Sequence, residues 1–215
     1  MKKLTITKEL RTFNELSTDL QLQAIEKNRE YFMYDTDYYM NDFIENTIVP
    51  MLNDKGFLTH EKNIEYDVNY VQGRGACFTC KDFEFNLLLE NLNIPHKKWI
   101  IDILNSGYVE CECKKRDFHY SHENTVRFNL YFYDTGNGHK RIDKILFDTI
   151  EDYIENIRYD LCIDMCKELT DNYEYYFSDD FIKSEFIENN VYFDSDLKPY
   201  WNESENDTNL NYNFE

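Results

Sequence analysis

The sequence has no long hydrophobic run. No stretch approaches the roughly eighteen consecutive apolar residues that a transmembrane helix requires. Residues 1–7 are followed by charged residues and not by the apolar segment of a signal peptide. We therefore expect a protein without a membrane-spanning segment, located in the cytoplasm, where its six cysteines stay reduced.

Positive charge is also scarce. Lys and Arg number 23 against 42 Asp and Glu, which gives a formal net charge of −19. Phosphate contacts require Lys and Arg, so this balance argues against direct binding of nucleic acid or of anionic membranes. It favours a basic partner: a nucleic-acid-binding protein, a polyamine or a metal cation. Self-repulsion on this scale favours a monomer or a dimer over larger assemblies.

Catalytic and nucleotide-binding signatures are missing as well. The glycine pair in residues 72–76 is followed by a strand pattern, whereas a phosphate-binding loop would lead into a helix. It predicts a hairpin turn. No Ser-His-Asp or Cys-His arrangement can be recognised in the sequence, because folding brings the residues of such sites together from distant positions. The sequence thus offers no catalytic residues and no cofactor motif, and we expect a protein that is not an enzyme.

Aromatic residues are abundant, at 17% of a chain of 215 residues that is 42% hydrophobic. This is enough material for a packed core. The length predicts one domain over residues 1–201. Residues 202–215 are rich in Asn, Asp and Glu and predict an acidic, flexible tail.

The longest regular pattern covers residues 141–173 and predicts a helix, because apolar residues recur at three- and four-residue steps without Gly or Pro. Acidic residues largely fall off this stripe and are expected to face water: Asp148, Glu151, Asp152, Glu155 and Asp171. The apolar stripe consists of Ile142, Leu146, Ile150, Tyr153, Ile154, Ile157, Leu161, Met165 and Leu169.

The other patterns predict an α+β fold. Helices are expected over about 18–33 and 38–53, separated by a cap at residues 35–37 and interrupted at Pro50, so that they form a helical hairpin. Further helices are expected over 95–105 and 178–189. Alternation predicts strands near 64–70, 76–80, 108–114 and 125–133, with a short edge strand at 191–193. These form an antiparallel sheet of about four strands, packed by the long helix and the N-terminal hairpin.

The cysteines provide an alternative function. Cys77 and Cys80 are followed by Cys111 and Cys113, and this spacing superficially resembles a zinc site that His119 could complete. Against zinc, Cys111 and Cys113 lie within an alternating strand and not in a tight loop. A zinc-binding structural or regulatory module remains the alternative, although no metal ligand is assigned.

The acidic residues provide the main hypothesis. Carboxylates three or four residues apart on a helix lie about 5–6 Å apart along its axis, and phosphates follow each other about every 3.4 Å along one DNA strand. An acidic array could therefore replace a polynucleotide in a basic groove. The simpler alternative is a solvated surface without a partner. The candidate residues are Glu151, Asp152, Glu155, Asp179, Asp180, Glu185, Glu188, Asp194 and Asp196.

Two segments carry a resemblance. Gln72-Gly-Arg-Gly-Ala-Cys-Phe78 follows an alternating strand, and Ser178-Asp-Asp-Phe-Ile-x-x-x-Phe-Ile-Glu-Asn-Asn-Val-Tyr-Phe193 follows the long acidic helix. Over about residues 16–197 the chain resembles a group of small, acidic bacteriophage proteins of unassigned function. The resemblance implies action in the host bacterial cytoplasm, as an anti-CRISPR or anti-restriction inhibitor that mimics DNA and binds a basic host nuclease or other nucleic-acid-binding protein. It transfers no catalytic residues.

Overall fold

The computed structural model describes residues 9–68, 74–116, 120–132 and 144–201. The chain forms two compact units: residues 1–37 with 174–215, called unit 1, and residues 38–173, called unit 2. The sequence predicts one domain over residues 1–201 and does not indicate this division. In the described part of the chain, no helix is both long enough and apolar enough to cross a membrane.

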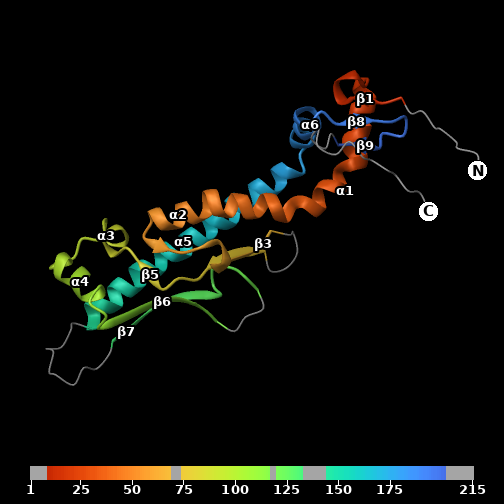
Figure 1. The fold of residues 1–215 in the computed structure, drawn as a ribbon. Helices are drawn as coiled ribbons and strands as arrows, with labels where there is room; N and C mark the ends of the chain where they lie inside the picture. Colours follow the sequence, from red (N-terminus) through yellow and green to blue (C-terminus); the bar gives the residue numbers. More distant parts are fainter. Residues whose placement is uncertain (1–8, 69–73, 117–119, 133–143, 202–215) are drawn as a thin grey trace, which may run out of the picture. The chain divides into compact units, whose positions relative to one another are not determined.

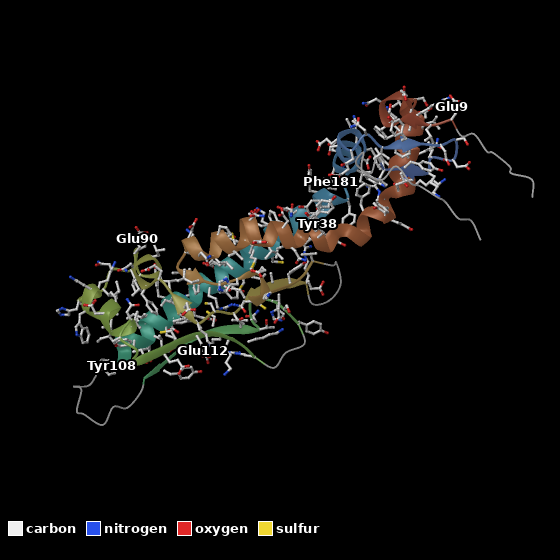
Figure 2. All side chains as sticks on the ribbon, in the orientation of Figure 1. Glu9, Tyr38, Glu90, Tyr108, Glu112 and Phe181 are labelled. Atoms are coloured by element: carbon white, nitrogen blue, oxygen red, sulfur yellow. The ribbon has the colours of Figure 1, made fainter. Side chains whose placement is uncertain are left out.

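Unit 1 is built around aromatic rings. Phe13, Phe186 and Phe193 lie with ring centroids 5.0–6.1 Å apart, and Phe181, labelled in Figure 2, packs against Phe32 at 6.1 Å. The Phe186–Phe193 and Phe32–Phe181 pairs meet edge to face and the two pairs of Phe13 are tilted, and such aromatic pairs add to the hydrophobic effect. The elements that contribute to this unit are β1 (Arg11–Thr12), a 3-10 turn (Phe13–Glu15), the first part of α1 (Thr18–Phe43), the end of α5 (Lys144–Tyr176), α6 (Asp179–Glu188), β8 (Tyr192–Phe193) and β9 (Pro199–Tyr200).

The prediction of an N-terminal helical hairpin is wrong. α1 continues through residues 35–37, where a cap was expected, and leads into a π-helical segment, Ile44–Ile48, and then α2 (Val49–Asp54). In that segment the N–H of Val49 bonds to the carbonyl of Ile44. Pro50, which has no N–H to donate, follows directly, so the wider turn arises where the α-helical ladder would lose a bond.

The prediction of a single antiparallel sheet of about four strands is also wrong. The strands expected near residues 64–80 and 108–133 exist but form separate antiparallel hairpins, β3 (Ile64–Asp67) with β4 (Gly75–Phe78), and β6 (Val109–Lys115) with β7 (Val126–Phe132). The hairpins meet at one isolated bridge between Cys80 and Cys113. The fold is still a mixture of helix and sheet with a long helix in its C-terminal half. β2 (Phe57–Leu58) and β5 (Asp82–Phe83) form a two-stranded sheet, and a three-stranded sheet has the order β1-β8-β9. The strand expected at an edge over residues 191–193 is therefore the central strand β8, which pairs with β1 and β9.

Close packing joins the two hairpins of unit 2. Gly75 lies against the segment at 121–122: an added Cβ would lie 2.3 Å from the Cβ of His122 and 2.9 Å from the carbonyl oxygen of Ser121. Only glycine allows this approach. The ring of Phe83 meets that of Phe128 at 5.4 Å and continues the core beneath the hairpins. Two short helices, α3 (Phe85–Leu88) and α4 (Lys97–Leu104), cover the same unit.

The long helix of the sequence analysis is confirmed as α5, whose first residues, 141–143, lie outside the described part. Within unit 2, Figure 1 shows α5 running along the hairpins. Most of the expected stripe is buried. Leu146, Tyr153 and Ile157 are half-buried, and Ile142 is not described. The buried positions are Phe147, Ile150, Ile154, Arg158, Leu161, Cys162, Met165 and Leu169. The opposite side of α5 faces solvent and forms the surface considered next.

Candidate functional site

The exposed side of α5 carries a row of carboxylates at four-residue steps. Residues four apart on a helix are neighbours, and each step advances about 6 Å along the axis. Asn156 occupies the single step that lacks a carboxylate. We call this set the α5 acidic row, and its exposed members are Asp148, Asp152, Asp160, Asp164 and Glu168.

The α5 acidic row is not neutralised within the described residues. None of its five carboxylates forms an ion pair there with Lys, Arg or His. Between residues 148 and 171, the basic side chains of α5 are Lys167, which is exposed, and Arg158, which is buried. Like charges four residues apart destabilise a helix by about 0.2–0.5 kcal/mol a pair, so the row costs stability in the isolated protein.

The α5 acidic row winds slowly around the helix. With 3.6 residues per turn, each four-residue step rotates by about 40°. The first and last members therefore point in widely different directions. Asp152, Asp160 and Asp164 lie nearer the middle of the exposed side and are the members that one partner surface could contact together.

Two of the predicted surface residues on α5 are half-buried and turn towards strand β7. Glu155 accepts a hydrogen bond from the backbone N–H of Phe128 at 2.8 Å. Glu151, four residues earlier, bonds to the backbone of Leu130, and burial raises the pKa of its carboxyl. Alternate N–H groups on the outer edge of β7 are thus covered by carboxylates one helical turn apart. Glu151 and Glu155 satisfy a strand edge, which is a structural task.

Arg158 fixes the position of Glu155. Its Nε and Nη2 atoms each donate to a different carboxylate oxygen of Glu155 at 2.8 Å, and Nη1 lies 3.4 Å from the Sγ of Cys162. The side chain is 1% exposed. Burial lowers the pKa of Arg158, but the hydrogen bonds and the charge of Glu155 outweigh this, so that the pKa is raised. A bidentate pair of this kind is geometrically specific. The apolar stripe gave no sign of a buried arginine.

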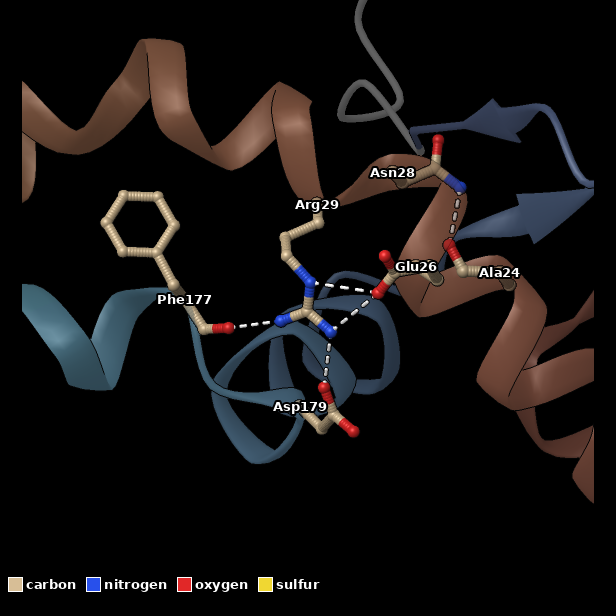
Figure 3. A network of polar contacts seen from close by, with 6 residues as sticks. All are labelled: Ala24, Glu26, Asn28, Arg29, Phe177 and Asp179. Carbon is tan, nitrogen blue, oxygen red and sulfur yellow. Dashed lines mark hydrogen bonds and ion pairs between the residues drawn. The ribbon is translucent and has the colours of Figure 1, made fainter.

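The predicted surface residues of unit 1 also divide into two groups. Arg29 lies 2.6 Å from Asp179, bonds to Glu26 at 3.1 Å and donates to the carbonyl of Phe177, as Figure 3 shows. Asp179 is therefore neutralised within its own unit. The pKa of Arg29 is raised, chiefly by this hydrogen bond to Asp179.

Asp194 is buried and organises the loop between β8 and β9. Its Oδ1 accepts from the N–H groups of Asp196 and Lys198 at 3.0 and 3.1 Å, and its Oδ2 accepts from the hydroxyl of Tyr200 at 3.1 Å. Glu185 is half-buried and bonds to Asn189. Neither residue is a free surface anion. Of the nine predicted residues, those that remain exposed without such a bond are Asp152 in unit 2 and Asp180, Glu188 and Asp196 in unit 1.

The members that sequence reasoning left out of the site are Asp148, Asp160, Asp164 and Glu168. A regular step of four residues was visible in the sequence and could have identified them. The alternation between exposed Asp152 and inward-facing Glu151 and Glu155 was not visible, because all three lie off the apolar stripe.

The zinc alternative is not supported by the geometry. No group of three or more His, Cys, Asp or Glu among the described residues could hold a metal ion. His119 lies outside those residues. Burial raises the pKa of the Cys111 thiol to about 12 and also raises the pKa of Cys77 and Cys113.

Comparison with known proteins adds no relative. No family model, no curated protein and no solved structure matches the chain.

Proposed function

We propose that the protein is a non-enzymatic inhibitor that binds a basic, nucleic-acid-binding protein through the α5 acidic row. It would occupy the partner's nucleic-acid groove in place of a polynucleotide. The partner would be a nuclease of a bacterial defence system, of the CRISPR or restriction type, and the inhibitor would be of bacteriophage origin. It would act in the host cytoplasm, as a monomer or dimer, without a cofactor.

The observation that carries the proposal is the exposure of unpaired carboxylates at regular steps on one helix. Their axial spacing of about 6 Å is close to the distance covered by two phosphate steps of about 3.4 Å along a DNA strand. Lys and Arg side chains that accommodate a phosphate backbone could therefore contact Asp152, Asp160 and Asp164 with small adjustments of their flexible stems.

The repulsion between the carboxylates of the α5 acidic row gives a second reason to propose a basic partner. The neighbouring like charges disfavour the isolated helix, and a cationic partner would remove that repulsion on binding. Counterions held by the basic groove would be released by carboxylates as they are by phosphates, so affinity should fall steeply as salt rises. A solvated surface without a partner would show no such binding.

The experiment is capture from a bacterial lysate with the immobilised full-length chain, at low and at high ionic strength, followed by identification of the bound proteins. We expect a basic, nucleic-acid-binding protein at low salt, its loss at high salt, and its displacement by added duplex DNA. Capture of no such protein at low salt, or capture that neither salt nor DNA reduces, would reject the proposal.

A further inference from the structure

We propose that Cys80 and Cys113 form a redox-modification site, in which a low-molecular-weight disulfide such as oxidised glutathione converts the two thiols into a cross-strand disulfide. Both residues belong to unit 2, and the site is independent of the α5 acidic row. It rests on the juxtaposition of the two side chains at the bridge between the hairpins.

The backbone places the two residues directly opposite each other. The N–H of Cys113 donates to the carbonyl of Cys80 at 2.8 Å, and the N–H of Cys80 donates to the carbonyl of Cys113 at 3.3 Å. This mutual exchange defines a hydrogen-bonded antiparallel pair, whose Cα atoms lie about 5.5 Å apart. Disulfides span Cα separations of about 4.4–6.8 Å, so the Cα separation of such a pair is compatible with a disulfide.

The side chains are already in contact. Burial and the neighbouring Cys80 thiol both raise the pKa of Cys113, as expected for two thiols held side by side at the bridge. They are 4% and 3% exposed, so no solvent separates them. A disulfide here would replace a thiol–thiol contact and fix the β3–β4 hairpin to the β6–β7 hairpin at the isolated bridge that joins them.

The other cysteines are less suited to forming a disulfide. Cys111 lies on the same strand as Cys113, opposite Leu130. The thiol of Cys162 receives a hydrogen bond from Arg158 and lies near Cys77, but the interaction between Cys162 and Cys77 is electrostatic. Within the described residues, Cys80 and Cys113 are the two cysteines that lie opposite each other at a backbone bridge.

The reaction is a thiol–disulfide exchange with oxidised glutathione. One protein sulfur attacks oxidised glutathione as the thiolate, forms a mixed disulfide and releases one glutathione thiol. The second protein thiol loses its proton, displaces the second glutathione and closes the Cys80–Cys113 bond. Two protein thiols are oxidised and one glutathione disulfide is reduced to two thiols. Burial keeps Cys113 protonated, and Arg158 opposes this effect, so the exchange is slow and follows local opening of the bridge.

The test uses the full-length chain, reduced and then equilibrated in glutathione buffers of increasing oxidised fraction. The remaining thiols are alkylated in denaturant, and the linked peptides are mapped by mass spectrometry. We expect two of the six thiols to escape alkylation, a peptide pair joining Cys80 to Cys113, and slower hydrogen exchange in β4 and β6. The replacement Cys166→Ala, at a half-buried site, should leave this linkage intact, whereas Cys80→Ser should remove it.

Three results would overturn the proposal: six alkylated thiols at the most oxidising ratio, a linkage between other cysteines such as Cys77 and Cys162, or a glutathione adduct that never closes. Because mapping on the unmodified chain decides among these, the outcome stands even if Cys80→Ser fails to fold.

Discussion

Arg158 places a permanent positive charge inside unit 2, where bonds to neighbouring side chains replace its water. Replacement by Met removes the guanidinium and leaves the Glu155 carboxylate with the N–H of Phe128 but without its charge partner. Breaking a buried pair in this way costs about 3–5 kcal/mol. We expect Arg158→Met to lower the free energy of unfolding in urea by this amount.

The matched control is Lys167→Ala, which removes one positive charge from the exposed side of the same helix and should change stability by about 0.5 kcal/mol or less. If Arg158→Met costs no more than this control, the pair does not fix Glu155. The double variant Glu155→Leu with Arg158→Met should recover part of the loss, because neither charge is then left unpaired.

Glu65 gives a prediction for pH. Its carboxylate bonds to Lys115 and to the hydroxyl of Ser121 at 2.8 Å, and the lysine bond holds its pKa below the ordinary value of 4.5. A lowered carboxyl pKa contributes stability that is complete above 4.5 and disappears as pH falls through the folded value. Glu65→Gln should therefore lower the unfolding free energy at pH 7, by about 0.2–1 kcal/mol for so exposed a pair, and have little effect at pH 2–3.

The exposed neighbour Glu61 supplies the control: Glu61→Gln should show a smaller effect at pH 7. Urea unfolding of the three proteins across this pH range measures the difference. A loss for Glu65→Gln that is equally large in acid would show that the bond to Lys115 is not its source.

At the residue scale, the sequence shows where the charged residues are, but it does not predict which of them face solvent and which bond to other parts of the protein. Asp152 and Glu155 look equivalent in the sequence, yet one is exposed and the other bonds to Phe128 and Arg158. The same holds in unit 1, where Asp194 is buried and Asp180 is exposed. The difference depends on which strand edge or loop a side chain meets, and these contacts are made by residues far apart in the chain.

At the element scale, the helix expected over residues 178–189 forms as α6, and its first residue position is capped. The Oγ of Ser178 accepts from the N–H of Phe181 at 3.2 Å, and the first turn carries Asp179 and Asp180, as expected at a helix N-terminus. Ser178→Ala should cost about 1 kcal/mol and speed hydrogen exchange in the first turn of α6. Ser178→Asp keeps an acceptor and should restore most of the protection. Equal exchange in both variants would mean that the cap does not hold the helix.

Strong local patterns predicted the long helix, α6 and the strands of both hairpins. The expected break at residues 35–37 did not form, and buried residues lie at steps that are multiples of four before and after it: Phe32, Met40, Ile44, Ile48 and Leu52. Apolar residues at helical steps on both sides of a segment outweigh residues that also occur as caps. The single sheet failed for another reason: alternation shows which face of a strand is buried, but not which strands pair.

At the scale of the whole molecule, acidic residues outnumber basic ones in both units, so the net charge of −19 is shared. The repulsion within the α5 acidic row should be screened by salt. We expect the thermal midpoint to rise as salt increases from about 0.01 to 0.15 M. The rise in the thermal midpoint should be smaller in a variant that carries Asp152→Asn, Asp160→Asn and Asp164→Asn. The difference should correspond to about 0.5–1 kcal/mol in the free energy of unfolding. Identical salt responses would indicate that these carboxylates do not repel one another.

The central claim is that the α5 acidic row, rather than net charge in general, binds the partner. The most direct measurement compares the amount of a basic, nucleic-acid-binding protein captured at low salt by three forms of the chain. These are the unmodified chain, the variant with Asp152→Asn, Asp160→Asn and Asp164→Asn, and a control with the same change in charge at exposed sites elsewhere in unit 2: Asp54→Asn, Glu90→Gln and Asp102→Asn. The claim predicts capture by the unmodified chain and the control, with at least about a tenfold loss in the α5 variant, since a loss of 1.4 kcal/mol is already tenfold in affinity. Equal capture by all three forms, or equal loss in both variants, would contradict it.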